Sequence, residues 1–272
     1  MGGRGSESTL HNGKERELAR LFNATRGPVH REIMRQAHET AREFTADHPI
    51  ARGKVDGIMS YDEFRKRYPD IWKQYKSDEE TYRSTLTAYA FTQHVGNGHS
   101  VIALNPARMN PQTLYRTYRN DQQGENPYHP RGTTARDIIT HEMGHVAHRI
   151  WDRMAAHSNS PIAYMSLANT AYRLLNNNHA RNSNEFARGY ANAVSNVSGY
   201  ATNSDRELVA EALADVRANG KNAKPMSRAI NYVLNNRETA LQRVLQLNKT
   251  SAKKYAKRSA KKYAKNTTRK RT

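Results

Sequence analysis

The chain has 272 residues, of which 36% are hydrophobic, and its 44 Lys and Arg against 25 Asp and Glu give a formal net charge of +19. This hydrophobic content is enough for one core with extensions, and the charge favours polyanionic partners without indicating a fold. The sequence contains no cysteine, which excludes disulfides, cysteine-ligated metals and thiol nucleophiles, so any metal site must be built from His, Asp and Glu.

The N-terminal region, residues 10–80, is predicted to be helical and to follow a disordered segment, residues 1–9. Residues 16–22 and 29–44 carry apolar side chains at helical spacing, and the Gly27–Pro28 pair separates them. We expect these two helices to pack as a hairpin. The first ten residues, MGGRGSESTL, lack the apolar centre of a signal peptide, and no later run reaches the about 18 to 20 apolar residues of a membrane span.

The segment from Ser60 to residue 93 is predicted to contain two further helices. Ser60 precedes Glu63 by three residues, a spacing typical of a helix capping box. Aromatic and aliphatic residues then recur between positions 61 and 75 as a stripe that is typical of a core. Residues 81–93 are expected to form another helix, which ends before the turn-forming Gly-Asn-Gly sequence at 96–98.

A change of period indicates one strand after this turn. Residues 100–105, SVIALN, are rich in branched side chains and are bounded by Gly98 and Pro106, which favours a strand over a helix. Residues 110–132 are polar and punctuated by proline, and we expect mostly loop around one short helix.

The sequence THEMGHVAH, residues 140–148, places two histidines four residues apart with a glutamate directly after the first. Thr134 stands three residues before Asp137 as a capping signature, and only one glycine interrupts the run from there to about residue 156. The motif is therefore predicted to lie inside a helix, with His141 and His145 on one side and an apolar stripe opposite. That stripe consists of Ile139, Met143, Val146, Ile150 and Met154.

Two neutral imidazoles one helical turn apart form a bidentate platform for zinc, and Glu142 lies beside them at an angle suited to a water molecule on the metal. The other interpretation is a pair of histidines on a solvated helix face. His148 lies near the same face, but the third ligand of a catalytic zinc site usually comes from elsewhere in the chain. A metzincin pattern, with Gly at 148 and His at 151, is absent because the sequence has His148 and Trp151.

A second helix is predicted within residues 198–220, where Ser204 and Glu207 have capping-box spacing and Gly220 provides a stop. This helix presents Glu207 and Glu211 one turn apart, and a carboxylate from it is the expected third ligand. Two assignments stay open at this point. Either Glu207 binds the metal, or Glu207 reaches back to cap its own helix while Glu211 binds the metal.

HEMGH, followed by Tyr200, by Glu207 seven residues later and by Glu211 four residues after that, resembles the gluzincin pattern of the anthrax-lethal-factor-like metallopeptidases. It also resembles the zincin domains of phage minor head proteins and of secreted toxins. The segment Leu104–Pro106 is similar to the end of the substrate-binding strand in that group. The resemblance covers residues 95–220 and extends neither to the N-terminal helices nor to the C-terminal tail.

The resemblance implies an α+β fold with a zincin-like metallopeptidase domain over residues 81–247, in which a small twisted sheet and a glutamate helix enclose the HExxH helix. The strand at Val101, Ile102 and Ala103 would lie at the rim of the cleft and bind an extended peptide or protein substrate by strand addition.

The resemblance also implies a Zn2+ ion with three protein ligands, His141, His145 and Glu207. Glu211 would be an outer partner that orients a ligand histidine, which favours Glu207 over Glu211 as the ligand. Glu142 would act as the general base, and Tyr200 would donate a hydrogen bond to the oxyanion. The other interpretation of Tyr200 is an aromatic lid over the loop.

Residues 248–272 form a basic low-complexity tail in which SAKKYAKR (251–258) is followed at once by SAKKYAKN (259–266). The repeat lacks large aliphatic residues, so we expect the isolated tail to be disordered. Lysines interleaved with tyrosines suit contact with phosphates and stacking on bases, whereas the alternative is a solubilising tail. The residues expected to bind nucleic acid or another polyanion are Lys253, Lys254, Lys257, Arg258, Lys261, Lys262, Lys265, Arg269, Lys270 and Arg271.

The sequence thus favours a zinc-dependent endopeptidase, either cytoplasmic or, by the resemblance, virion-associated. A second hypothesis is a non-catalytic phage structural or DNA-associated protein that retains a zincin scaffold. A third is a metalloprotease toxin whose tail binds anionic surfaces. The combination of HExxH, Tyr200 and Glu207 favours an enzyme, because a scaffold needs none of these residues.

Overall fold

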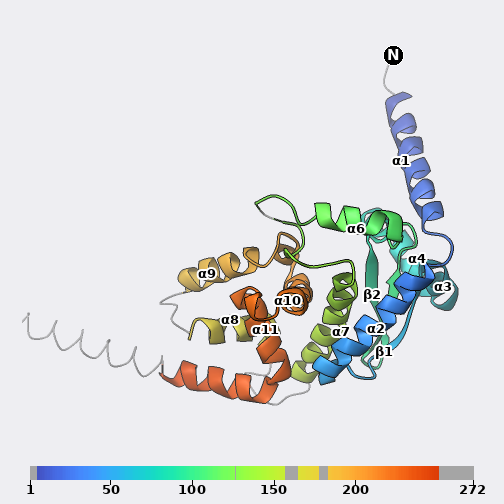
Figure 1. The fold of residues 1–272 in the computed structure, drawn as a ribbon. Coiled ribbons are helices and arrows are strands. Elements are labelled where there is room, and N and C mark those ends of the chain that lie inside the picture. The colour runs from blue at the N-terminus through green and yellow to red at the C-terminus, as the bar shows by residue number, and fades with distance from the viewer. Residues whose placement is uncertain (1–4, 126, 157–164, 178–182, 251–272) are drawn as a thin grey trace, which may run out of the picture.

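The computed structural model describes residues 5–125, 127–156, 165–177 and 183–250. These residues form a mainly helical body with one three-stranded mixed sheet, which confirms the α+β class (Figure 1). No helix in the described part of the chain is long and apolar enough to cross a membrane. Of the basic tail predicted at residues 248–272, residues 248–250 continue a helix, and all the residues predicted to bind polyanions lie outside the described residues.

The sheet contains β1 (Val55–Ser60), β3 (His99–Leu104) and β2 (Ala90–Gly96) in that spatial order. β3 is parallel to β1 and antiparallel to β2. β3 confirms the strand predicted at residues 100–105. β1 was not predicted, and it precedes the domain boundary expected between residues 80 and 81, so the sheet draws strands from both sides of that boundary.

The prediction that Val101, Ile102 and Ala103 bind substrate by strand addition is wrong. These residues lie in the central strand, whose two edges already pair with β1 and β2, and all three side chains are fully buried. A central strand has no unpaired backbone groups to offer to a peptide. The strand at the edge of the sheet nearest the HExxH helix is β2, which pairs only with β3 among the described strands.

The helix predicted at residues 81–93 is confirmed in its first part and wrong in its second. α5 (Glu79–Thr87) begins after the N-cap Asp78, whose side chain accepts a hydrogen bond from the backbone N–H of Thr81. The helix ends at Thr87, and β2 begins at Ala90. Backbone pairing of β2 with β3 across the tight turn at 96–98 overrides the helical pattern of this short segment.

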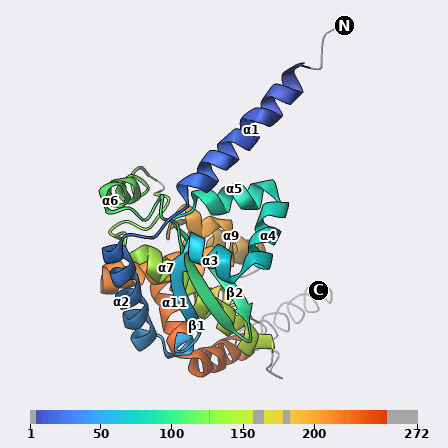
Figure 2. The same ribbon diagram turned by 90° about the vertical axis from the view of Figure 1, so that its right-hand side faces the viewer.

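The predicted N-terminal hairpin is also wrong. α1 (Gly5–Ala24) begins within the segment expected to be disordered and projects from the body, and only its C-terminal part reaches α5 (Figures 1 and 2). α2 (Arg31–Asp47) instead packs along α7 (Asp137–Ala156). The apolar residues near the end of α1 pack against a largely aromatic cluster of buried side chains on one face of the sheet. This contact keeps α1 apart from α2.

The two faces of the sheet are covered by different layers. Val101 and Ala103 face the aromatic cluster, formed with α3 (Tyr61–Arg67), α4 (Pro69–Ser77) and α5. Ile102 and Leu104 face the larger core, which contains α7. This alternation follows from the two-residue period of a strand and explains why β3 reads as a continuous apolar run. The predicted cap of α3 is confirmed, because Ser60 accepts a hydrogen bond from the backbone N–H of Glu63.

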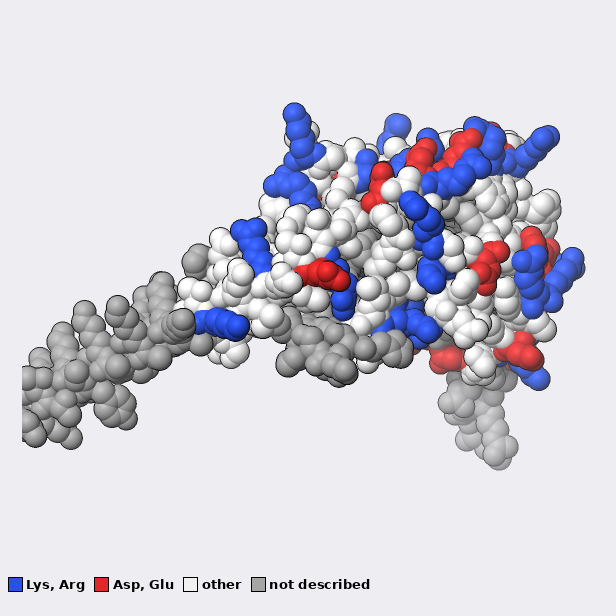
Figure 3. All heavy atoms as spheres, turned by 90° about the horizontal axis from the view of Figure 1, so that it is seen from below, with Lys and Arg blue, Asp and Glu red and all other residues white. Residues whose placement is uncertain are grey.

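α10 (Asp205–Asn219) packs on α7 from the side away from the sheet, most of the remaining elements lie beyond it, and α6 (Pro111–Asn120) lies apart from them near the sheet (Figure 1). The other elements are α8 (Leu167–Leu175), α9 (Ser183–Ser195), η2 (Tyr200–Asn203), η3 (Gly220–Asn222), α11 (Pro225–Asn235) and the helical residues 237–250. Of the predicted apolar stripe on α7, Met154 is 44% exposed in the last turn, whereas the other four residues are buried. On the face shown in Figure 3, basic side chains are spread over the surface and outnumber acidic ones, so the positive charge is not confined to the tail.

α7 and α10 approach each other closely at Gly144. A Cβ atom added to this glycine would lie 2.7 Å from the Cα of Ala210 and 3.3 Å from its Cβ. Both distances are shorter than van der Waals contact, and one of them is to the backbone of the facing helix. The distance between the two helices therefore depends on the absence of a side chain at position 144.

Replacing Gly144 by alanine is expected to push α10 away from α7 and to lower the free energy of unfolding by about 1 to 3 kcal/mol, the usual cost of overpacking. The control is Gly13→Ala on α1, where nothing lies within 4 Å of the added Cβ. That variant should keep or slightly raise stability, because alanine has the higher helix propensity. Urea denaturation of both variants measures the difference, and equal stability of Gly144→Ala and the parent chain would contradict the close contact.

Candidate metal centre

Two imidazoles face each other on α7. His141 and His145 lie one helical turn apart, both are 8% exposed, and their rings meet edge to face with centroids 4.7 Å apart. Their Nε2 atoms are 3.1 Å apart. Two ring nitrogens at this separation can share one proton or face a common cation, so the arrangement selects for a positive charge between them.

Glu207 completes a three-residue group from the first turn of α10. Its Oε2 lies 3.1 Å from Nε2 of His141 and 3.4 Å from Nε2 of His145. The three candidate ligand atoms lie within 4.8 Å of one another, and the group could hold a metal ion. Two imidazole nitrogens with one carboxylate oxygen are a donor set that divalent transition metals accept.

The start of α10 explains how Glu207 reaches the histidines. The Ser204 hydroxyl accepts a hydrogen bond of 3.2 Å from the backbone N–H of Glu207 and so caps the helix, as the sequence predicts. The carboxylate of Glu207 does not complete a capping box. It points at the imidazoles, where its Oε2 is buried and accepts no well-directed hydrogen bond from the described residues.

Glu211 lies one turn further along α10 than Glu207 and contacts the other ring nitrogen of His141, Nδ1. Its Oε1 accepts hydrogen bonds from Nδ1 of His141 at 2.7 Å and from Nδ1 of His129 at 3.1 Å, and its Oε2 accepts one from the Ser198 hydroxyl at 2.9 Å. Because a carboxylate only accepts, Nδ1 of His141 must carry the proton, and Nε2 is left to face Glu207. This is the arrangement by which an outer partner orients a ligand histidine.

The electrostatics of the group favour a bound cation. Burial alone would raise the pKa of Glu211, but the hydrogen bonds from His129 and His141 outweigh burial and lower the pKa to about 2. Burial likewise opposes the charge on His141, yet Glu207 and Glu211 outweigh it and raise the pKa of His141 well above its usual value. These carboxylates therefore stay ionised, and they stabilise either a proton or a metal ion at the imidazoles.

Glu142 is the third carboxylate of the site, and the sheet supplies its hydrogen-bond donor. The Thr92 hydroxyl on the edge strand β2 donates a hydrogen bond of 2.7 Å to Oε2 of Glu142 and lies 3.0 Å from the backbone carbonyl of the same residue. Glu142 is 5% exposed. The contact couples the edge strand directly to the HExxH helix.

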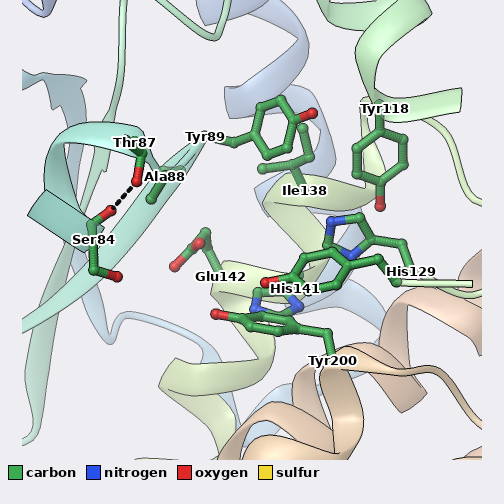
Figure 4. A pocket seen from close by; sticks show the side chains of 12 residues that line it. Ser84, Thr87, Ala88, Tyr89, Tyr118, His129, Ile138, His141, Glu142 and Tyr200 are labelled. Carbon is green, nitrogen blue, oxygen red and sulfur yellow. Dashed lines mark hydrogen bonds between the residues drawn. The ribbon is translucent and has the colours of Figure 1, made fainter. Parts of the chain in front are cut away.

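Tyr200 lies beside His141, just before α10. Its ring stacks on the His141 ring at a centroid distance of 5.7 Å, and the centroid of the Tyr128 ring lies 4.8 Å from that of Tyr200. In Figure 4 the Tyr200 hydroxyl and the Glu142 carboxylate point toward the same space. Burial, and after it the charge of Glu207, raise the pKa of Tyr200 far above its usual value, so the phenol stays protonated and can donate.

A pocket opens beside these side chains. It has a volume of about 200 Å³, and its lining includes His141, Glu142, Tyr200, Tyr89, Tyr118 and Ile138 (Figure 4). Ala90 and Tyr128 also line it. The aromatic rings of its wall suit a bulky apolar group, and Ser84, Thr87 and His129 add polar atoms to the lining. Ala90 is the first residue of β2, so the pocket lies at one end of the edge strand.

The structure thus brings together six of the residues singled out in the sequence: His141, Glu142, His145, Tyr200, Glu207 and Glu211. His148 lies apart from the group, with Nδ1 3.7 Å from Asp152. Sequence reasoning missed Thr92, His129 and Ser198, which hold the carboxylates. Of these three residues, only His129 is of a type that is common in metal sites. It lies in a loop, and its spacing to Glu211 matches no known motif.

Comparison with known proteins found no matching family model, no matching curated protein and no matching solved structure. The assignment of the metal group rests on the geometry above.

Glu207→Gln is expected to abolish stoichiometric binding of a divalent metal ion, because it removes a charged ligand. Glu211→Gln should retain the metal with about 10- to 100-fold weaker affinity, the usual effect of losing an outer partner. Metal content after dialysis and metal titration measure both effects.

Ser204→Ala is the matched control, since it removes the cap of the same helix and keeps both carboxylates. It should lose about 1 kcal/mol of stability and keep its metal. Metal loss in Glu211→Gln alone, with Glu207→Gln still loaded, would reverse the assignment of the ligand.

Proposed function

We propose that this chain is a zinc-dependent endopeptidase with a zincin-like catalytic domain. The observation that carries the proposal is the convergence of His141, His145 and Glu207, with Glu142 buried beside them and held by an edge strand. The resemblance of the HExxH and glutamate motifs to gluzincins points the same way.

Zinc suits the donor set, because two imidazoles and one carboxylate are a common protein shell for catalytic zinc. His141, His145 and Glu207 would hold the ion. When bound, zinc would lower the pKa of a water molecule and polarise the carbonyl group of a peptide bond.

Glu142 would be the general base. Its carboxylate would take a proton from the attacking water and later deliver it to the leaving amine. The hydrogen bond from Thr92 occupies one side of the carboxylate and limits its rotation, which holds the other oxygen ready for the water. Thr92 is therefore proposed as a positioning residue.

Tyr200 would donate its hydroxyl hydrogen bond to the oxyanion of the tetrahedral intermediate. Its raised pKa keeps the proton on the phenol at neutral pH, and its stacking on His141 fixes the direction of the ring. The alternative role as an aromatic lid uses the same stacking but needs no hydroxyl, so Tyr200→Phe separates the two roles.

An extended peptide would pair with β2, the edge strand that carries Thr92, and not with the central strand β3. Strand addition satisfies the backbone groups that an edge leaves unpaired. A peptide on β2 would place one side chain in the aromatic pocket at the Ala90 end.

We also propose that the tail binds nucleic acid or another polyanion. Ten of the 44 Lys and Arg residues lie after residue 250, with no acidic residue among them. Binding to DNA would suit the phage-associated hypothesis, in which the peptidase works on or within a particle.

Glu142→Gln is expected to abolish peptide hydrolysis while zinc stays bound, because the base is lost and the three ligands remain. Cleavage of a peptide library, with and without a chelator, and zinc content of the same samples test this. Full activity in Glu142→Gln would contradict the proposed chemistry.

Tyr200→Phe should lower kcat by about 10- to 1000-fold with little change in KM, as expected for the loss of one oxyanion donor.

Deleting residues 251–272 is expected to leave folding and peptide hydrolysis unchanged and to weaken binding to DNA. The dependence of log affinity on log salt should become shallower, because fewer phosphates are neutralised. Binding to single- and double-stranded DNA over a series of salt concentrations measures the effect. Equal affinity and equal slope in the two proteins would show that the tail is not the polyanion site.

A further inference from the structure

β2 and α7 run side by side, and three observations indicate their register. At the first end, Ala90 and Ile138 line the same pocket. In the middle, Thr92 contacts Glu142. Beyond the far end of β2, Gly98 lies against Arg153, whose Nε is 3.4 Å from the position of an added Cβ. A peptide that pairs with β2 would therefore extend from the aromatic pocket, past Glu142, toward the residues near His94.

Two exposed arginines belong to the helices beside the far end of this path. Arg149 follows His145 by one turn of α7, and Arg206 directly precedes Glu207 on α10. Both side chains are exposed, and neither forms an ion pair with any residue in the described part of the chain. His94 faces the same space, because it lies two residues after Thr92 and so on the same face of β2.

The positive charge at this end comes from the two arginines. Burial lowers the pKa of His94 to about 4, with further contributions from the charges of Arg149 and Arg206, so His94 is neutral at neutral pH. Arg149 lies on α7 between Glu142, which contacts Thr92, and Arg153, which lies against Gly98, so it belongs to the part of α7 beside this end of β2.

The acidic groups at the same end are already engaged. Asp152 lies 3.7 Å from Nδ1 of His148. Asp205 accepts hydrogen bonds from the hydroxyls of Ser166, at 3.0 Å, and Tyr190. Neither carboxylate contacts Arg149 or Arg206 within ion-pair distance, which leaves both arginines available to a ligand.

We propose that Arg149 and Arg206 select peptides that carry an acidic side chain on the side of the scissile bond that lies against His94. The substrate class is then a peptide with a large apolar residue in the aromatic pocket and a carboxylate at the opposite end of β2. This inference rests on the proposed peptidase function and specifies its substrate.

The test uses the Glu142→Gln protein loaded with zinc, which should bind peptides without cleaving them. Fluorescence anisotropy compares two labelled peptides that share one large apolar residue and differ only by Glu or Gln, with the variable position placed in turn on either side. The Glu peptide should bind about 3- to 10-fold more tightly on one side only, and added salt should weaken the preference.

Arg149→Gln combined with Arg206→Gln should abolish this preference and leave the affinity for the Gln peptide unchanged. The matched control is Arg243→Gln, an exposed arginine in the helical residues 237–250, which removes one charge elsewhere and should keep the preference. Equal affinity for the Glu and Gln peptides on both sides, or a preference that survives the double variant, would overturn the proposal.

Cleavage assays on the protein with Glu142 intact separate this inference from the proposed function. An arginine-dependent preference in binding without any hydrolysis would contradict the peptidase and support the binding preference. Hydrolysis of Glu and Gln peptides at equal rates, with equal binding, would support the peptidase and overturn the role of the arginines.

Discussion

The close contact of α7 and α10 at Gly144 is the constraint on which the site depends. Glu207 and Glu211 reach across from α10 to His141 and His145 on α7, and the short contacts between these side chains require the helix backbones to lie nearly against each other. A side chain at position 144 would collide with the backbone of Ala210. The glycine inside the HExxH motif thus has a packing role that is separate from the chemistry of its neighbours.

Burial of carboxylates gives the site its second constraint, since Glu142 and Glu211 are buried and Glu207 is partly buried. Glu142, Glu207 and Glu211 surround two imidazoles, and isolated buried charges are costly unless they are paired and hydrogen-bonded. Glu211 is satisfied by His129, His141 and Ser198, and Glu142 by Thr92. Oε2 of Glu207 lies against the Nε2 atoms of both imidazoles and accepts no well-directed hydrogen bond from the described residues, so a cation between these groups would balance its charge. The same arrangement would serve a zinc ion in the proposed peptidase.

Local signals in the sequence predicted the two helices of the site. The Ser204 cap and the Gly220 stop define α10, and the spacing of His141, Glu142 and His145 defines one face of α7. The order of the strands could not be predicted, because it depends on pairing between distant segments. The sequence pattern therefore predicts a rim strand at Val101 to Ala103, which are central, and a helix at Thr92, which lies on the edge strand and contacts Glu142. His129 and Ser198 could not be predicted as site residues for a similar reason, since only the folded chain brings them to Glu211.

Anomalous diffraction at the zinc edge, from crystals of the full chain grown with zinc, tests the central claim most directly. The account predicts one strong peak per chain, bound by Nε2 of His141, Nε2 of His145 and a carboxylate oxygen of Glu207, at about 2.0 to 2.2 Å from each. Glu211 should remain hydrogen-bonded to Nδ1 of His141 without contacting the metal. A peak bound by Glu211 in place of Glu207, or no peak between the two histidines, would contradict it.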